Sequence, residues 1–314
     1  MNAHSRRDFL RTLAIAGTAA TAWPLRAAPA DRPGPLRLGG PLFDVGNDPE
    51  EIAQAHRRLG YRAAYCPNVS LGESDRIQAF RDAFARHDVV VAEVGRWVNL
   101  MDADPGRRAA NLKLVTDGLA LAEAIGARCC VDIAGSLNPT VWYGPHPENL
   151  SPRFFDAAVE NARKIIDAVR PKQAKFCYEM MGWALPDSVE SYRRLIKAVD
   201  RKEFGVHLDP CNLVNSPERF YRNAELLEDC FDRLGKWIVS CHSKDLKWEV
   251  EMNVHFVEVR PGSGSMNYRT YLRRLNALPQ RPPLMLEHLA NAAEYDAARK
   301  HLLALGAEIG TPFE

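Results

Sequence analysis

The sequence predicts an α/β fold, a single (β/α)₈ TIM barrel over residues 36–314. From residue 36 onward, eight short β-rich runs alternate with segments of helical period. No change in composition divides this part of the chain, and such barrels commonly use about 250 residues for one domain. A doubly wound open sheet would give the same alternation, but no G-x-G-x-x-G motif follows a predicted strand, which disfavours a dinucleotide site.

The predicted strands are short and are followed by amphipathic segments. The strands cover residues 36–43, 61–66, 89–94, 129–133, 174–179, 204–209, 237–242 and 284–287. The helical segments include 76–87, 107–125, 152–169, 189–199, 217–234, 268–278 and 293–305. An Asp or Ser directly before Pro predicts four helix starts, at Asp48, Asp104, Ser151 and Ser216. Three glycines stand where helices are expected to end: Gly60, Gly126 and Gly235.

The N-terminus carries a targeting pattern. Arg6 and Arg7 lie in the run S-R-R-D-F-L, and a short apolar stretch follows at 13–20. This resembles the twin-arginine translocation signal, S-R-R-x-F-L, and the resemblance implies export of a folded protein to the periplasm or otherwise out of the cytoplasm. We therefore expect a signal peptide at 1–30 and a linker at 31–35; the alternative is a basic N-terminal helix.

The composition disfavours two classes of partner. The net charge is +1 with acidic and basic residues interleaved, so no basic surface for nucleic acid is expected. No apolar run reaches the roughly 18 residues of a membrane span. The seven cysteines are odd in number and form no C-x-x-C pair, so we expect small buried side chains rather than disulfides. The composition leaves open whether the chain forms a homo-oligomer.

The last four barrel strands share a pattern of alternation, since successive side chains face the lumen and the helix layer in turn. The large apolar residues of one parity suit the helix layer: Phe176, Tyr178, Val206, Leu208, Val239, Cys241, Leu284 and Leu286. The opposite parity carries one polar residue at each strand's C-terminal end, where active sites of this fold lie: Glu179, Asp209, His242 and Glu287.

Three carboxylates and one imidazole are thus expected in a single volume. Nearby carboxylates repel each other, and a divalent cation would compensate. Such a ligand set favours Mn²⁺ or Mg²⁺ and is compatible with Co²⁺, Fe²⁺ or Zn²⁺. Singly, each residue is more often a helix cap, an ion-pair partner or a hydrogen-bonded structural histidine; together they predict one metal site.

Five motifs carry a resemblance to a known family: Y-E-M-M-G-W from 178, H-L-D-P-C-N from 207, C-H-S-K-D from 241, R-P-G-S-G from 260 and M-L-E-H-L from 285. They resemble the sugar phosphate isomerase/epimerase family of the xylose-isomerase-like superfamily. The resemblance implies that Glu179 and Glu287 are both metal ligands and the acid/base pair, and that Asp209 and His242 are ligands only. Ketose 3-epimerases commonly carry D-x-x-H after the sixth strand, whereas here Asn212 stands at that His position; its amide can bind a hydroxyl but cannot take up a proton.

Other polar residues are candidates for a supporting role. Lys244 is expected at the rim, to stabilise an enolate oxygen or bind an acidic substrate, or else to pair with Asp245. Glu93 ends the third strand and is expected to bind a substrate hydroxyl, or to form a structural ion pair. His207 is expected to lie deeper than Asp209 and to hydrogen-bond behind the ligands.

Aromatic and loop residues complete the candidates. Trp183, together with Trp142 and Tyr143, is expected to wall a sugar site, since aromatic faces suit the apolar faces of sugar rings. Arg260 begins a glycine-containing loop that would suit a phosphate, or that simply turns the chain.

Three functions remain open for a small sugar substrate. The first is an isomerase or epimerase that moves a proton adjacent to the carbonyl of a sugar or sugar derivative. The second is a lyase that eliminates a group from 3-keto-glycosides after the same first step. The third is a non-catalytic periplasmic sugar-binding barrel, against which two opposed carboxylates argue.

Overall fold

The structure is a computed structural model that describes residues 35–313. Eight parallel strands close into a barrel in the order β1-β10-β7-β6-β5-β4-β3-β2, so the predicted fold class is confirmed. The strands are β1 (Leu38–Gly39), β2 (Ala63–Tyr65), β3 (Val90–Gly95), β4 (Cys129–Asp132), β5 (Lys175–Glu179), β6 (Phe204–Leu208), β7 (Ile238–Ser243) and β10 (Leu284–Leu286). The predicted signal peptide, and residues 31–34 of the predicted linker, lie outside the described residues.

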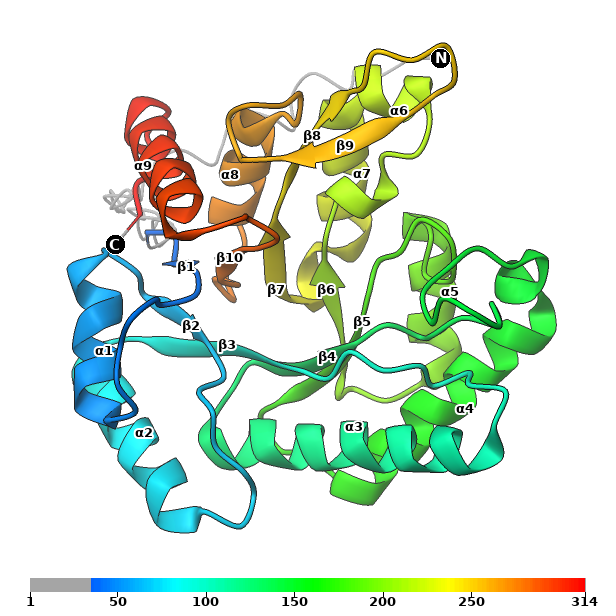
Figure 1. Cartoon of the computed structure of the whole chain (residues 1–314), viewed down its shortest axis with the longest axis horizontal. Helices are drawn as coiled ribbons and strands as arrows, with labels where there is room; N and C mark the ends of the chain where they lie inside the picture. The colour runs from blue at the N-terminus through cyan, green and yellow to red at the C-terminus, as the bar shows by residue number, and fades with distance from the viewer. Residues whose placement is uncertain (1–34, 314) are drawn as a thin grey trace, which may run out of the picture. The chain divides into compact units, whose positions relative to one another are not determined.

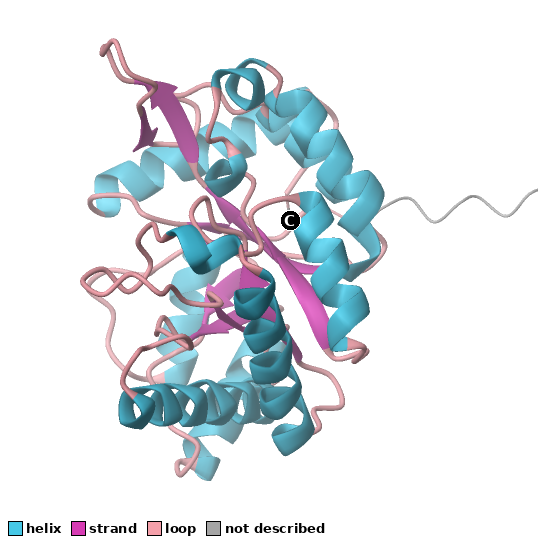
Figure 2. Ribbon diagram, turned by 90° about the vertical axis from the view of Figure 1, so that its right-hand side faces the viewer, coloured by secondary structure: helices cyan, strands magenta, loops and turns pink. Residues whose placement is uncertain are grey.

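Helices surround the strands (Figure 2). They are α1 (Pro49–Arg58), α2 (Ser74–Arg86), α3 (Pro105–Ile125), α4 (Pro152–Val169), α5 (Val189–Val199), α6 (Pro217–Tyr221), α7 (Asn223–Leu234), α8 (Tyr268–Asn276) and α9 (Ala292–Glu308), with short 3₁₀ turns η1 (Pro147–Leu150), η2 (Cys211–Leu213) and η3 (Gly235–Trp237). The four predicted caps are confirmed, because each side chain accepts a hydrogen bond from a first-turn backbone N–H: Asp48, Asp104, Ser151 and Ser216. Gly126 ends α3 in the left-handed conformation, with φ of 79°.

The segment 217–234 differs from the single helix that was predicted. The backbone leaves helical geometry at Arg222, with φ −113° and ψ 32°, and separates α6 from α7. The Asn223 amide donates to the carbonyls of Phe220 at 2.7 Å and Ser265 at 3.0 Å, which ties the break to the loop before α8. Gly235 does follow the helix end, but in a right-handed conformation that opens η3.

An antiparallel hairpin, β8 (Asp245–Trp248) and β9 (Phe256–Val259), follows β7 and was not predicted. It lies beside α6, at the top of the view in Figure 1. The Phe256 ring stacks on Phe220 of α6, with centroids 4.9 Å apart and planes 5° apart. The hairpin returns the chain toward the barrel, so that Glu258 of β9 comes within 4.0 Å of the Lys244 Nζ.

Strand register decides which side chains reach the lumen. The register shifts between β6 and β7, where Val206 pairs with Ile238 but His207 pairs with Ser240. The additional residue, Val239, packs against Cys129, Val131 and Cys177 in a small lumenal cluster. Its predicted place on the helix side is therefore wrong, because a bulge breaks strict alternation. The other seven residues of the predicted helix-side set join the main core: Phe176, Tyr178, Val206, Leu208, Cys241, Leu284 and Leu286.

Six of the seven cysteines are buried, and Cys66 is partly exposed. Among residues 35–313, no helix combines the length and apolar character needed to cross a membrane.

Candidate metal centre

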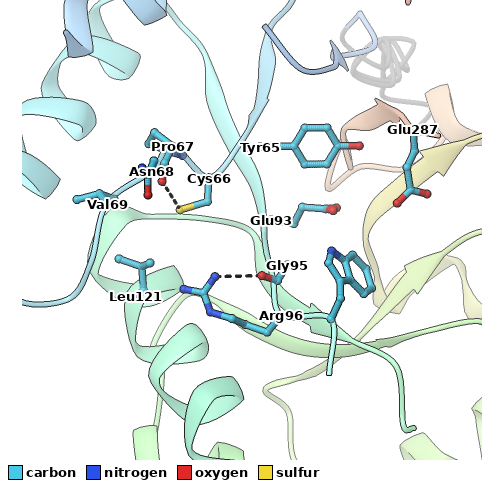
Figure 3. A pocket seen from close by; sticks show the side chains of 11 residues that line it. Tyr65, Cys66, Pro67, Asn68, Val69, Glu93, Gly95, Arg96, Leu121 and Glu287 are labelled. Atoms are coloured by element: carbon cyan, nitrogen blue, oxygen red, sulfur yellow. Dashed lines mark hydrogen bonds between the residues drawn. The ribbon is translucent and has the colours of Figure 1, made fainter. Parts of the chain in front are cut away.

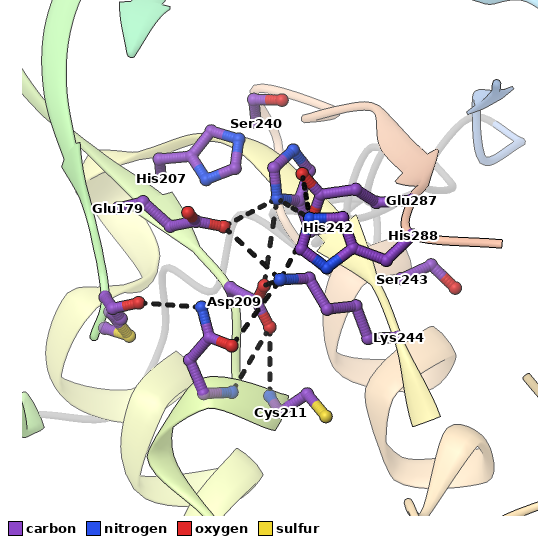
Figure 4. Close-up of polar contacts among 12 residues, drawn as sticks. Glu179, His207, Asp209, Cys211, Ser240, His242, Ser243, Lys244, Glu287 and His288 are labelled. Atoms are coloured by element: carbon purple, nitrogen blue, oxygen red, sulfur yellow. Dashed lines mark hydrogen bonds and ion pairs between the residues drawn. The ribbon is translucent and has the colours of Figure 1, made fainter. Parts of the chain in front are cut away.

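Four side chains converge at the C-terminal ends of neighbouring strands (Figure 4). Glu179 ends β5, Asp209 follows β6, His242 lies in β7 and Glu287 follows β10. One ligand atom of each lies within 4.8 Å of the others. From His242 Nδ1, Glu179 Oε1 lies 2.7 Å away and Glu287 Oε2 lies 2.8 Å away. Asp209 Oδ2 lies 3.7 Å from the same nitrogen. The structure thus brings together the four residues that strand parity singled out.

Hydrogen bonds to the backbone fix these strand ends. Asp209 Oδ1 accepts from the backbone N–H of Cys211 at 3.1 Å, at the start of η2, so Oδ2 is left to face the other ligands. The Tyr271 hydroxyl donates to the His242 carbonyl at 2.9 Å. The Tyr65 hydroxyl donates at 2.9 Å to the carbonyl of Leu286, the residue before Glu287.

The donor set fits one divalent cation. Asp209 Oδ2 and Glu287 Oε2 are buried and make no well-formed hydrogen bond, although the Lys244 Nζ lies 2.8 and 3.0 Å from them. Buried carboxylate oxygens without such partners are costly, and a cation among them would remove the cost. Three carboxylates with one imidazole suit Mn²⁺ or Mg²⁺.

A buried carboxylate, that of Glu93, contacts the second ring nitrogen of His242. Glu93 Oε1 lies 3.0 Å from His242 Nε2, while Glu93 Oε2 lies 2.7 Å from His207 Nε2. The Ser240 hydroxyl also donates to Glu93 Oε2, at 2.9 Å. Burial would raise the pKa of Glu93, but the adjacent His242 and His207 outweigh it and lower that pKa. This arrangement leaves His242 Nδ1 free to point at the three other ligands.

Glu93 therefore lies below the candidate ligands and forms buried ion pairs with His242 and His207, one of the two roles expected of it, and it also lines a neighbouring cavity. Its side chain is only 1% exposed, and both of its oxygens are occupied by His242, His207 and Ser240. His207 lies deeper than Asp209, as its position in β6 predicted. Its Nε2 lies 2.7 Å from Glu93 Oε2, and its ring packs edge-on against the His242 ring with centroids 4.2 Å apart.

Lys244 places an ammonium group among the carboxylates of the site. It is buried, with the Nζ between Asp209 and Glu287, and 3.5 Å from the Asn212 carbonyl oxygen. Burial would lower the pKa of Lys244, but the carboxylates of Asp209, Glu179 and Glu287 outweigh burial and raise it. The ammonium is thus charged at neutral pH and directed at the carboxylates. Asp245, the alternative partner expected for Lys244, instead accepts hydrogen bonds from four backbone N–H groups.

The two glutamates differ in their surroundings. Burial raises the pKa of Glu179. Burial acts in the same direction on Glu287, but His242 and Lys244 outweigh it and lower the pKa of Glu287 to about 2. The surroundings therefore shift the pKa values of the two carboxyls in opposite directions, which is how an acid and a base are set apart.

A cavity of about 470 Å³ opens onto these groups. Its aromatic lining comes from Trp97, Trp142 and Tyr143. Its polar lining comes from Glu179, Asn212, Lys244, Glu258, Glu287 and His288. The Asn212 amide donates to the Met180 carbonyl at 3.0 Å, so its carbonyl oxygen is the group presented toward Lys244.

Two expected contacts lie elsewhere. The Trp183 side chain is 62% exposed and does not line this cavity, because the loop directs it to the surface. The Arg260 Nε lies 3.1 Å from Glu294 at the start of α9, away from the cavity lining. Neither residue is placed to contact a substrate in this cavity.

Sequence reasoning missed Glu258 and His288 at the cavity mouth. His288 Nδ1 lies 2.9 Å from Glu258 Oε2, and this contact raises the pKa of His288. His288 also adopts a left-handed backbone, with φ of 56°, which for a residue other than glycine often marks a functional site. His288 directly follows Glu287, so its position was a usable signal; Glu258 gave none, because the hairpin that carries it was not predicted.

Comparisons with known proteins identify the family of this fold. The family model described as "Xylose isomerase-like TIM barrel" matches residues 53–305. No curated protein matches the chain.

Solved structures share the fold at low sequence identity. A xylose isomerase-like TIM barrel protein from Mycobacterium smegmatis, in complex with magnesium, is 18% identical, with a TM-score of 0.61 over 88% of this chain and 97% of that one. The 3-keto-D-glucoside 4-epimerase of E. coli is 14% identical, with a TM-score of 0.60 over 87% and 99%. The probable 3-DHS dehydratase of Bacillus anthracis is 14% identical, with a TM-score of 0.60 over 85% and 98%.

Proposed function

The chain belongs to the xylose isomerase-like TIM barrel family, and we propose that it is a metal-dependent isomerase or epimerase that moves a proton adjacent to the carbonyl of a sugar or sugar derivative. One observation carries the proposal: Glu179 and Glu287 meet at the same nitrogen of His242, at 2.7 and 2.8 Å, while their pKa values are shifted in opposite directions. A protein that only bound a sugar would have no need of two such carboxyls.

The residues divide the proton transfer between them. Glu287, ionised because His242 and Lys244 lower its pKa, removes the proton from the carbon beside the carbonyl. Glu179, whose pKa is raised by burial, returns a proton to that carbon from the other side or to the neighbouring carbon. A divalent ion bound by the four ligands would polarise the carbonyl and acidify the adjacent C–H bond.

Lys244 supports the same step. Its charged Nζ borders the cavity and lies within 4.0 Å of both glutamates. A negatively charged oxygen that develops on the substrate there would be stabilised by this donor, which is already fixed in place by Asp209.

The cavity suits a sugar. Its volume of about 470 Å³ lies within the usual range for small-molecule sites, roughly 300 to 1,000 Å³. Trp97, Trp142 and Tyr143 offer aromatic faces for the apolar side of a sugar ring, while the ligand cluster, Asn212 and Lys244 offer polar contacts for its hydroxyls.

Elimination is the second candidate, and His288 favours it. His288 lines the mouth of the cavity, and its contact with Glu258 raises its pKa, so it could donate a proton to a leaving group there. A lyase acting on 3-keto-glycosides would use the same first proton removal and would then expel that group. The fold similarity to a probable dehydratase is consistent with this alternative.

The test is an NMR screen of aldoses, ketoses and 3-keto-glycosides in D₂O, with Mn²⁺-loaded protein. Isomerisation or epimerisation should introduce deuterium beside the carbonyl, whereas elimination should release a free aglycone. Glu179→Gln and Glu287→Gln should each abolish turnover while at least one still binds metal, because an amide oxygen remains a weak ligand. Glu160→Gln, an exposed residue paired with Lys164, is the matched control and should stay active. Turnover that survives in both glutamine variants would contradict the acid/base assignment. A wild-type protein that binds sugars without exchanging deuterium or releasing an aglycone would be a sugar-binding barrel.

Mn²⁺ is the resident ion in this proposal, with Mg²⁺, Co²⁺, Fe²⁺ and Zn²⁺ as the other candidates. The oxygen-rich ligand set with a single imidazole supports it. Metal analysis of protein purified without added metal should find about one divalent ion per chain. A different ion at that stoichiometry would correct the identity of the metal but keep the site.

Export by the twin-arginine route is also part of the proposal and rests on the run that contains Arg6 and Arg7. Replacing both arginines by lysine should leave the protein in the cytoplasm, as measured by cell fractionation. Normal export of the double variant would contradict this route.

A further inference from the structure

A second cavity of about 440 Å³ lies beside the substrate cavity (Figure 3). Trp97 and Glu287 line both cavities, so the two meet at the ligand cluster. The second cavity runs past the end of β3 to the loop after β2, where Cys66 and Asn68 border it. None of the steps proposed above uses this space.

The far end of this cavity carries an arginine without an acidic partner. Arg96 is partly buried, and its guanidinium makes one hydrogen bond, from Nη1 to the Gly95 carbonyl at 3.0 Å. The Arg96 Nε is buried and has no hydrogen-bond partner among the described residues. No carboxylate within residues 35–313 forms an ion pair with Arg96, so its fixed positive charge is available to a ligand.

The neighbouring helix makes room for this side chain. Gly118 lies inside α3, where glycine costs roughly 0.5–1 kcal/mol relative to alanine. A Cβ at Gly118 would lie 2.6 Å from Arg96 Cγ and 3.0 Å from Cys130 Sγ. Any larger residue would displace the arginine stem, so the path of Arg96 into the cavity depends on this glycine.

Charge is distributed unevenly along the cavity. In Figure 3 the guanidinium of Arg96 lies toward one end and the carboxylate of Glu287 at the other, while the carboxylate of Glu93, paired with His242 and His207, lies between them. A guanidinium binds a carboxylate or phosphate through two parallel hydrogen bonds, whereas the end near Glu287 repels an anion.

We propose that this second cavity is a subsite for an oxyanion substituent of the substrate, a carboxylate or a phosphate, bound by Arg96 while the reacting carbonyl lies at the ligand cluster. The inference rests on the proposed function and narrows its substrate class to acidic sugars, such as uronic acids, or to phosphorylated sugars. Trp97 then separates the part of the substrate that reacts from the part that is recognised.

Titration calorimetry on Mn²⁺-loaded protein tests the subsite with matched sugars. The probes are glucose, glucuronate and glucose 6-phosphate, and the corresponding galactose and mannose sets. At least one acidic member should bind about tenfold or more tightly than its neutral parent, because the hydrogen bonds are charge-assisted. Tighter binding of the uronate identifies a carboxylate, and tighter binding of the phosphate ester identifies a phosphate. If no acidic sugar binds more tightly than its parent, the proposal is overturned.

Variants then assign the preference to Arg96. Arg96→Leu should abolish the preference for the acidic sugar while the neutral parent and Mn²⁺ bind as before. Arg193→Leu, which removes an exposed arginine on α5, is the matched control and should keep the preference. A preference that persists in folded Arg96→Leu protein means that the anion binds elsewhere, and overturns the proposal.

Gly118→Ala keeps the arginine charge but shifts its stem, and covers the case in which Arg96→Leu does not fold. Gly118→Ala should weaken binding of the acidic sugar but not of its neutral parent. An unchanged preference for the acidic sugar would count against the subsite. The deuterium-exchange screen is independent of these measurements. If neutral sugars exchange deuterium but no acidic sugar binds more tightly than its parent, the proposed function stands and the anion subsite is wrong. If acidic sugars bind more tightly through Arg96 but no sugar exchanges deuterium, the anion subsite stands and the proposed function is wrong.

Discussion

Replacing Glu93 by Gln is the most informative single change near the metal centre. The glutamine keeps the size of the side chain but removes the negative charge that faces His242 Nε2 at 3.0 Å. Its amide nitrogen would face the Ser240 hydroxyl and His207, whose Nδ1 has no hydrogen-bond partner among the described residues. His207 is therefore free to change tautomer and accept the new N–H, so the fold should tolerate the change.

Metal affinity should suffer more than stability. A carboxylate behind a ligand histidine raises the basicity of the ring, and its loss typically costs about 10- to 100-fold in metal affinity. That range corresponds to about 1.4 to 2.7 kcal/mol of binding free energy. The metal-free variant should stay folded but lose some stability, because the buried ion pair with His242 loses its Glu93 partner while Glu179 and Glu287 still face that ring.

Calorimetric titration with Mn²⁺, paired with urea unfolding in the presence of a chelator, measures both quantities. Glu258→Gln is the control, since this residue lies at the cavity mouth and forms ion pairs with Lys244 and His288 rather than with His242. Ser240→Ala, which removes one donor to Glu93, should lower the affinity by a few-fold at most. Wild-type affinity in Glu93→Gln would refute the view that Glu93 orients and polarises His242.

Four further predictions concern the candidate metal centre and the barrel core. Asp209→Ala should abolish Mn²⁺ binding, measured as metal per chain; one ion retained would remove Asp209 from the ligand set. Burial would lower the pKa of His242, but Glu287, Glu93 and Glu179 outweigh it and raise that pKa, so the metal-free ring is protonated at neutral pH. Binding should therefore release about one proton and weaken as pH falls, measured by calorimetry in buffers of different ionisation enthalpy; pH-independent affinity would contradict this. Protonated His242 should contribute its full stabilisation of the metal-free protein below pH 6.5. This contribution should be lost as pH rises through the raised pKa of His242, and the free energy of unfolding at several pH values would detect the loss. Tyr192→Phe removes a buried hydroxyl that lies 2.6 Å from the Tyr178 carbonyl and 3.0 Å from the Gly205 carbonyl, and should cost about 1–3 kcal/mol in urea unfolding; no loss would show that these carbonyls find other partners.

Local pattern was enough to predict the main elements of the barrel. Helix starts depend on a side chain that bonds a backbone N–H three residues later, so Asp48, Asp104 and Ser151 were readable from neighbouring residues alone. The hairpin formed by β8 and β9 was not readable, because its packing on α6 depends on the contact between Phe256 and Phe220. Strand parity similarly failed at Val239, where pairing with β6 inserts an extra residue.

The sequence by itself determined the eight-fold alternation of strands and helices and the convergence of the four candidate ligands, because a period of two residues places every second side chain of a strand on one face. Only the tertiary structure decided what surrounds those ligands. Glu93 contacts His242 across 149 residues of chain, and Glu258 reaches His288 from a hairpin that leaves the barrel. Arg96 enters its cavity only where Gly118 of the adjacent helix provides space. Such contacts depend on strand register and on the packing of distant elements, neither of which the local periodicity of a sequence encodes.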